Sequence, residues 1–100
     1  MSLRQKQSEF AMKLALLILF ANEAGYEVTI SDVQSFPKHK RHRRGSFHYK
    51  RLAADLNLFK DGTYLKNNLD HLQLGEFWKS IGGSWGGDYG DGNHYSYGED

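Results

Sequence analysis

The chain has 100 residues, a formal net charge of +1 at pH 7 and no cysteine. A chain of this length forms one small domain, and without cysteine it excludes disulfide staples and thiolate zinc sites, so a metal ion would have to be held by histidine and carboxylate. The near-neutral total hides a basic run at residues 38–44 (KHKRHRR), which holds five of the thirteen Lys and Arg residues.

The first predicted element is a helix that includes the apolar run at residues 10–21. This run is too short to span a bilayer and contains Lys13, and cleaving it as a signal peptide would shorten an already small domain. Ser2 and Gln5 fit a capping box, apolar residues recur at helical spacing, and Gly25 fits a C-terminal cap. We therefore expect a core helix, with no membrane span and no clear signal peptide.

The next segments alternate apolar and polar residues, as half-buried strands do. One strand is predicted at residues 26–30 and another at residues 52–58, with Asp55 and Asn57 on its polar face. Residues 32–47 contain a proline, a glycine and the basic run, which indicates a long exposed loop. The sequence Lys60-Asp61-Gly62-Thr63 predicts the turn of a hairpin into residues 64–65.

The C-terminal part predicts a second helix and a last strand. Asn68 or Asp70 fits an N-cap, apolar residues follow at helical spacing from Leu74 to Ile81, and Gly82-Gly83 end the helix. Six glycines between residues 82 and 92 indicate a tight, irregular loop before a strand at residues 93–97. The expected fold is a single α+β domain over residues 1–100, with two helices packed on a small, mainly antiparallel sheet that carries a zinc site at one edge.

Two histidines and two carboxylates are spaced so that one metal ion can collect three of them. His48 precedes the strand that contains Asp55, and His94 begins the last strand. Neighbouring strands lie about 5 Å apart, so pairing these two strands would bring the ligands together. Asp91 would then approach the open side of the metal. Three protein ligands, an open coordination position and a nearby base are what a catalytic zinc site needs.

Both motifs resemble those of a known enzyme family. The stretch from Ser46-Phe47-His48 to Ala53-Ala54-Asp55-Leu56 is similar to the motif SxHxxGxAxD, and Trp85-Gly86-Gly87-Asp88 followed by Asp91-Gly92-Asn93-His94 is similar to a C-terminal D-x-x-H signature. These are motifs of the zinc D,D-carboxypeptidases and L-alanyl-D-glutamate peptidases, and the likeness is greatest to small phage and prophage endolysins that cut peptidoglycan stem peptides.

The resemblance implies a Hedgehog/D,D-peptidase-like fold with one zinc ion. It implies His48, Asp55 and His94 as the zinc ligands and Asp91 as the catalytic base. Ser46 and Trp85 would support the site or contact the substrate.

The chain departs from the family pattern at two places. Arg51 stands where the motif usually has glycine, although the phage subgroup resembles this chain there. Many members also carry an arginine soon after the first strand, thought to steady the substrate, whereas residues 31–35 read Ser-Asp-Val-Gln-Ser. Either Arg41, Arg43 or Arg44 supplies that charge from the following loop, or the loop is shortened and the activity is altered or lost.

The activity implied is hydrolysis of an amide bond in the peptidoglycan stem peptide, L-alanyl-D-glutamate in the first place. A D,D-carboxypeptidase is the alternative, and the C-terminal carboxylate of its substrate would demand a well-placed cation. We expect a monomer that stays in the cytoplasm of the bacterial host until it is released to the periplasm or cell wall.

A hypothesis of a different class is a nucleic-acid-binding module that uses residues 38–44 to contact phosphates. The run has no interleaved aromatic residue and the pI is only about 8.0, which favours the enzyme. In an enzyme, the same charges would attract it to anionic cell-envelope polymers. His39, His42 and His71 are expected to be ordinary surface or hydrogen-bonded residues.

Overall fold

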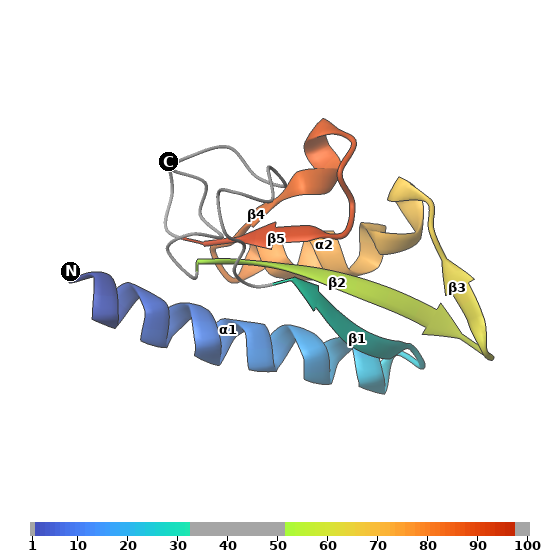
Figure 1. Ribbon diagram of the computed structural model, residues 1–100, viewed down its shortest axis with the longest axis horizontal. Coiled ribbons are helices and arrows are strands. Elements are labelled where there is room, and N and C mark those ends of the chain that lie inside the picture. Colours follow the sequence, from blue (N-terminus) through green and yellow to red (C-terminus); the bar gives the residue numbers. More distant parts are fainter. Residues whose placement is uncertain (1, 33–51, 98–100) are drawn as a thin grey trace.

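The computed structural model describes residues 2–32 and 52–97. The elements, in chain order, are α1 (Leu3–Glu23), β1 (Glu27–Asp32), β2 (Ala53–Lys60), β3 (Thr63–Leu65), the 3-10 turn η2 (Asn68–His71), α2 (Leu72–Ser80), β4 (Ser84–Trp85), the 3-10 turn η3 (Gly86–Tyr89) and β5 (His94–Ser96). Two helices accompany one antiparallel sheet (Figure 1), so the predicted α+β class is confirmed.

β2 is the central strand of the sheet. The strand order is β1-β2-β5-β4, and β3 pairs with the C-terminal end of β2. The β2–β3 hairpin turns through Asp61 and Gly62, whose φ angles are 52° and 79°. Positive φ at both central residues is what a two-residue hairpin turn requires, which explains the Asp-Gly sequence. The pairing of β5 beside the strand that holds Asp55 is as predicted.

α1 begins and ends where the sequence predicts. The backbone N–H of Gln5 donates to Ser2 Oγ at 3.1 Å, and the backbone N–H of Ser2 donates to Gln5 Oε1 at 2.8 Å, which completes a capping box. Gly25 follows the helix with a φ of 98°, a conformation that glycine adopts without strain.

The position of α1 differs from the predicted core helix. Figure 1 shows it running along one side of the molecule, and it buries only one face, through Phe10, Leu17 and Ala21. Its outer face leaves three large apolar side chains exposed, Met12, Leu16 and Leu19. Helical spacing identifies which residues share a face but not how many faces the remaining chain covers. In the part of the chain that the structure describes, neither helix has the length and hydropathy to cross a membrane.

The core forms between the helices and one face of the sheet. Alternate residues of β2 and the residue before it point into it, as predicted: Leu52, Ala54, Leu56 and Leu58. Trp78 of α2 makes edge-on contacts with the rings of Phe10 and Tyr95, at centroid distances of 6.0 and 6.1 Å. Because side chains alternate along a strand, Asp55 of β2 and His94 of β5 lie on the opposite face of the sheet.

The entry into α2 corrects the predicted N-cap. The chain turns at Asn67, whose backbone N–H donates to the Asp70 carboxylate at 2.9 Å. Asp70 therefore acts from inside the first turn, and Asn68 lies within that turn. Gly82, with a φ of 99°, follows the helix as predicted. The glycine-rich segment is more ordered than expected, because it contains β4 and η3.

Candidate active site

Asp55 and His94 face each other across the β2–β5 pair. The adjacent pair carries the ladder hydrogen bond, from the backbone N–H of Leu56 to the carbonyl oxygen of Asn93 at 2.9 Å. Asp55 and His94 are therefore a non-hydrogen-bonded pair, the type in which opposed side chains come closest. His94 Nδ1 lies 3.2 Å from Asp55 Oδ1, with both side chains about one-quarter exposed or less. Strand pairing thus joins two polar residues that are far apart in sequence.

This pair fits part of a zinc site. Imidazole nitrogen and carboxylate oxygen are both good zinc donors, with bond lengths of about 2.0–2.2 Å. Two such atoms in one tetrahedral shell lie roughly 3.3–3.5 Å apart, and the 3.2 Å between His94 Nδ1 and Asp55 Oδ1 is close to that spacing. Within residues 2–32 and 52–97, no group of three His, Cys, Asp or Glu side chains could hold a metal ion, and His48, the third predicted ligand, lies outside these residues.

Asp91 opens a tight turn that leads into β5. Its carbonyl oxygen accepts the backbone N–H of His94 at 3.1 Å, and its own N–H donates to the carbonyl oxygen of Gly86 at 2.9 Å. A Cβ at Gly86 would lie 2.4 Å from the Asp91 carbonyl oxygen and 2.8 Å from His94 Cβ. Glycine at position 86 therefore permits the close approach of the two segments. The turn keeps exposed Asp91 next to the strand end that carries His94.

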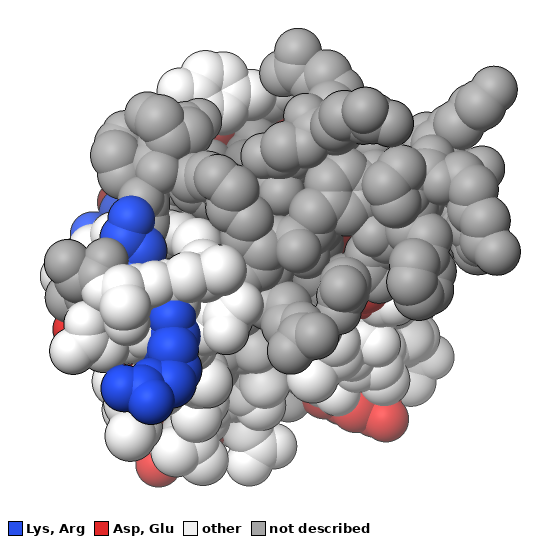
Figure 2. Space-filling view, turned by 60° about the vertical axis from the view of Figure 1, so that its left-hand side comes forward, with Lys and Arg blue, Asp and Glu red and all other residues white. Residues whose placement is uncertain are grey.

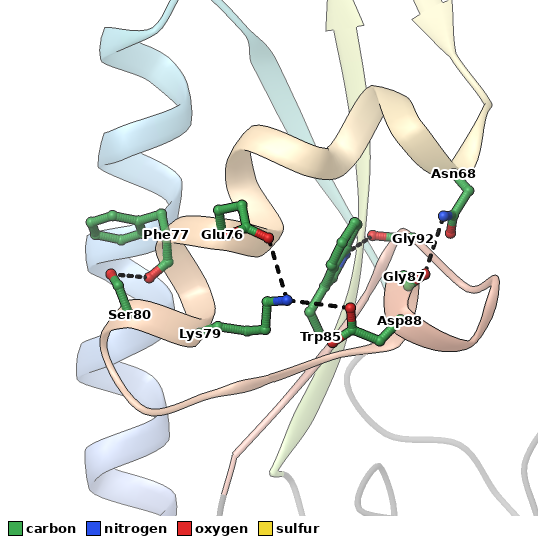
Figure 3. Close-up of polar contacts among 9 residues, drawn as sticks. All are labelled: Asn68, Glu76, Phe77, Lys79, Ser80, Trp85, Gly87, Asp88 and Gly92. Atoms are coloured by element: carbon green, nitrogen blue, oxygen red, sulfur yellow. Dashed lines mark hydrogen bonds and ion pairs between the residues drawn. The ribbon is translucent and has the colours of Figure 1, made fainter.

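Trp85 holds this turn from the core side. Its indole is 4% exposed, and Nε1 donates to the carbonyl oxygen of Gly92 at 2.7 Å. Glycines at positions 75 and 87 flank the ring, since a Cβ at either one would come within 2.2 Å or 2.0 Å of it. Figure 3 shows the indole between α2 and the η3 segment, with its bond to Gly92. Of the two roles considered for Trp85, this burial favours support of the site over contact with a substrate.

Lys79 of α2 lies beside Trp85 and the η3 segment. Its Nζ is 3.2 Å from Asp88 Oδ1, 3.3 Å from Glu76 Oε2 and 5.7 Å from the centroid of the Trp85 ring (Figure 3). The hydrogen bonds to Asp88 and then to Glu76 raise the pKa of Lys79. Because the pairs are solvent-exposed, they contribute little to stability. The ammonium group of Lys79 is therefore already bound to two neighbouring carboxylates.

The sheet therefore presents a carboxylate–imidazole pair beside a D-x-x-H turn, held by a buried tryptophan. A family profile described as D-alanyl-D-alanine carboxypeptidase matches residues 39–97, more than half of the chain. The chain belongs to the D-alanyl-D-alanine carboxypeptidase family. The resemblance to the D,D-carboxypeptidases that the two motifs indicate is thus confirmed, and it identifies the chain as a peptidase. The greater likeness to phage endolysins stays a prediction. No curated protein and no solved structure matches the chain.

The D-alanyl-D-alanine carboxypeptidase match covers all four residues of the predicted centre, His48, Asp55, Asp91 and His94. The structure brings Asp55 and His94 into contact and puts Asp91 one turn away in the chain. The other predicted site residues, and the basic run, lie outside the described residues: Ser46, His48, Arg51, Arg41, Arg43 and Arg44. Their roles stay predictions.

His71 lies buried behind the Asp91 turn. It is 3% exposed, and its Nδ1 is 2.8 Å from the hydroxyl oxygen of Tyr95. Desolvation lowers the pKa of His71, partly opposed by the charges of Asp70 and Asp91, and burial raises the pKa of Tyr95. The sequence predicts that His71 is either a surface residue or a hydrogen-bonded one. The hydrogen bond is confirmed, and the surface position is wrong. The spacing of His71 from Leu74 and Trp78 on one helical face was the signal that sequence reasoning missed.

Proposed function

We propose that the chain is a zinc peptidase that hydrolyses an amide bond in the stem peptide of peptidoglycan, the L-alanyl-D-glutamate bond in the first place. The observation that carries the proposal is the 3.2 Å approach of His94 Nδ1 to Asp55 Oδ1, next to a D-x-x-H turn, in a member of a peptidoglycan carboxypeptidase family. His48, from the SxHxxGxAxD-like stretch that also contains Asp55, would complete the ligand set.

The residues have complementary roles in this proposal. Zinc held by His48, Asp55 and His94 would supply Lewis-acid polarisation of the scissile carbonyl and make water a stronger nucleophile at neutral pH. Asp91 takes the proton from the attacking water and then delivers it to the leaving amine. The β2–β5 ladder fixes Asp55 against His94, and the turn bonded to Gly86 fixes Asp91 relative to His94.

D,D-carboxypeptidase activity is the second candidate, and the description of the matching family favours it. The L-alanyl-D-glutamate proposal is supported by the likeness of residues 51–59 and 74–78 to endolysins, and it would make the chain an enzyme of cell-wall lysis. Such an enzyme would act after release from the bacterial cytoplasm to the wall. The two candidates differ in the bond cut and share the proposed chemistry.

Family membership favours the enzyme over the nucleic-acid-binding hypothesis. A surface that binds nucleic acid requires a basic patch or stripe. On the described part of the face shown in Figure 2, basic side chains lie among uncharged ones and acidic side chains lie toward the edges. Residues 38–44, on which the nucleic-acid hypothesis rests, lie outside the described residues, so this view does not test it. For residues 38–44 we propose attraction to anionic cell-envelope polymers instead.

The test is mass spectrometry of the fragments released from purified peptidoglycan, with and without a metal chelator. Endopeptidase activity releases a peptide with a new D-glutamate amino terminus, whereas carboxypeptidase activity releases free D-alanine. Both should stop when the chelator is added and return when zinc is restored. Fragments that form equally with the chelator present would refute the zinc proposal, and no release of any fragment would refute the peptidase proposal.

A further inference from the structure

A polar pocket of 170 Å³ opens beside Asp91. One wall is formed by the segment after β3, with Lys66, Asn67 and Asn68, and the other by the turn before β5, with Asp91 and Asn93. A larger cavity of 490 Å³ lies between the end of α1 and β1, but none of the candidate site residues lines it. Of these two, the smaller pocket borders the proposed reaction.

The two walls of this pocket are held together by direct contacts. Asn68 Nδ2 donates to the carbonyl oxygen of Gly87 at 3.2 Å, which ties η2 to η3. A Cβ at Gly92 would lie 2.6 Å from the carbonyl oxygen of Asn68, so the turn packs against η2 with no room for a side chain. The pocket is thus preformed, and a ligand would not have to organise it.

The chemistry assigned to Asp91 fixes which part of the substrate lies nearest to this pocket. A base that delivers a proton to the leaving amine must lie on the side of the leaving residue. In both candidate bonds, the leaving residue carries a carboxylate on the carbon that bears the new amine. That residue is D-alanine in one case, and in the other D-glutamate linked onward through its side chain.

The pocket offers donors for such a carboxylate. Lys66 is the one lysine or arginine among the described residues that line it, and Asn67 and Asn93 add amide groups. An ammonium group and a carboxylate make a charge-assisted hydrogen bond, about twice as strong as a neutral one. Resting on the proposed function, we infer that this pocket binds the α-carboxylate of the leaving residue, with Lys66 as its cationic partner. Lys79 is not proposed for this role, because it is already paired with Glu76 and Asp88.

The test is an NMR titration of the whole chain with γ-D-glutamyl-L-lysine and with a matched ligand. In the matched ligand, the α-carboxylate of the D-glutamyl residue is replaced by a neutral carboxamide. We expect the backbone amide signals of Lys66, Asn67 and Asn93 to shift, and the acid to bind about tenfold more tightly than the amide. Lys66→Gln should remove this preference, and Lys66→Arg should retain it. Lys60→Gln is the matched control, because Lys60 lies in the hairpin that precedes Lys66 but has its Nζ over the Tyr26 ring, 5.1 Å from the ring centroid.

The titration measures binding, so its outcome is independent of turnover. Equal affinity for acid and amide, an unchanged preference in Lys66→Gln, or no binding of either ligand would overturn the pocket assignment. Should the wild-type chain bind the acid preferentially and yet release no fragment from peptidoglycan, the proposed function fails and the carboxylate pocket stands. Cleavage without any preference for the acid rejects the pocket alone.

Discussion

The indole N–H of Trp85 donates to the carbonyl oxygen of Gly92, 2.7 Å away, so a core residue holds the turn that separates Asp91 from His94. The position of a catalytic group must be held closely, since a displacement of about 1 Å can cost roughly 100-fold in rate. The proposed base therefore depends on the packing of α2 against Trp85 as well as on its own turn.

Trp85→Phe is expected to weaken both the fold and the reaction. Phenylalanine cannot donate a hydrogen bond, so the buried carbonyl of Gly92 would lose its partner, at a cost of about 1–3 kcal/mol in the free energy of unfolding. Urea unfolding measures this loss, and kcat should fall while zinc affinity changes less. Tyr89→Phe is the control, because Tyr89 is 90% exposed in the neighbouring 3-10 turn and should stay within about 0.5 kcal/mol of the wild type. A Trp85→Phe protein of unchanged stability would show that the bond does not hold the turn.

His94→Ala is expected to abolish stoichiometric zinc binding. The substitution removes one of three proposed ligands, so zinc affinity should fall by more than the roughly 10–100-fold that loss of a residue supporting a ligand costs. Metal analysis of the purified protein and calorimetric titration with zinc measure the effect.

Asn57→Ala is the matched control for the zinc measurement. Asn57 lies on the same face of β2 as Asp55, two residues away, and its side chain donates to Thr29 Oγ1 at 3.3 Å. It should bind zinc as the wild type does. Retention of one tightly bound zinc ion per chain in His94→Ala would remove His94 from the ligand set.

Asp91→Asn is expected to separate zinc binding from catalysis. The amide keeps the size of the side chain but cannot accept a proton from water, so turnover should fall by about 10²–10⁴-fold while zinc is retained. Asp88→Asn removes the same charge from the same loop, where Asp88 pairs with Lys79 instead, and should keep its activity. Equal rates of peptidoglycan cleavage by Asp91→Asn and the wild type would exclude Asp91 as the base.

The central features of the site follow from periodicity, which a sequence displays directly. Alternation along residues 52–58 places Asp55 on the face of the sheet opposite to that of buried Ala54 and Leu56, and pairing with the last strand sets His94 across from it. The D-x-x-H spacing then sets Asp91 one turn before the strand. Local pattern is enough for the face of each side chain and for the spacing of the turn. The pairing of β2 with β5, in contrast, joins segments that lie far apart in the chain.

The features that the sequence did not reveal depend on contacts between distant segments. Trp85 lies against Gly75, a glycine that looks like an unfavourable helix residue until the indole is seen to occupy the space of its side chain. Similarly, Ile30 is 53% exposed although alternation predicts half-burial, and the β1–β2 register shifts between Ile30 and Asp32. The register is regular up to Ile30, which pairs with Leu56, so its exposure does not come from a change of face. β1 ends the described strand order, and alternation shows which residues share a face but not how much of that face is covered.

Buried His71 is expected to make the stability of the fold depend on pH. Desolvation lowers its pKa in the folded state below the ordinary value of 6.5, so between these two pKa values the unfolded chain binds a proton that the folded chain does not. The contribution of His71 to stability is therefore complete above about pH 6.5 and is lost as the pH falls toward the folded pKa. Urea unfolding at about pH 7.5 and about pH 5, for the wild type and for His71→Asn, isolates this contribution because the other titrating groups are common to both proteins. The loss of stability on acidification should be smaller in His71→Asn, and an equal loss in the two proteins would mean that protonation of His71 does not oppose folding.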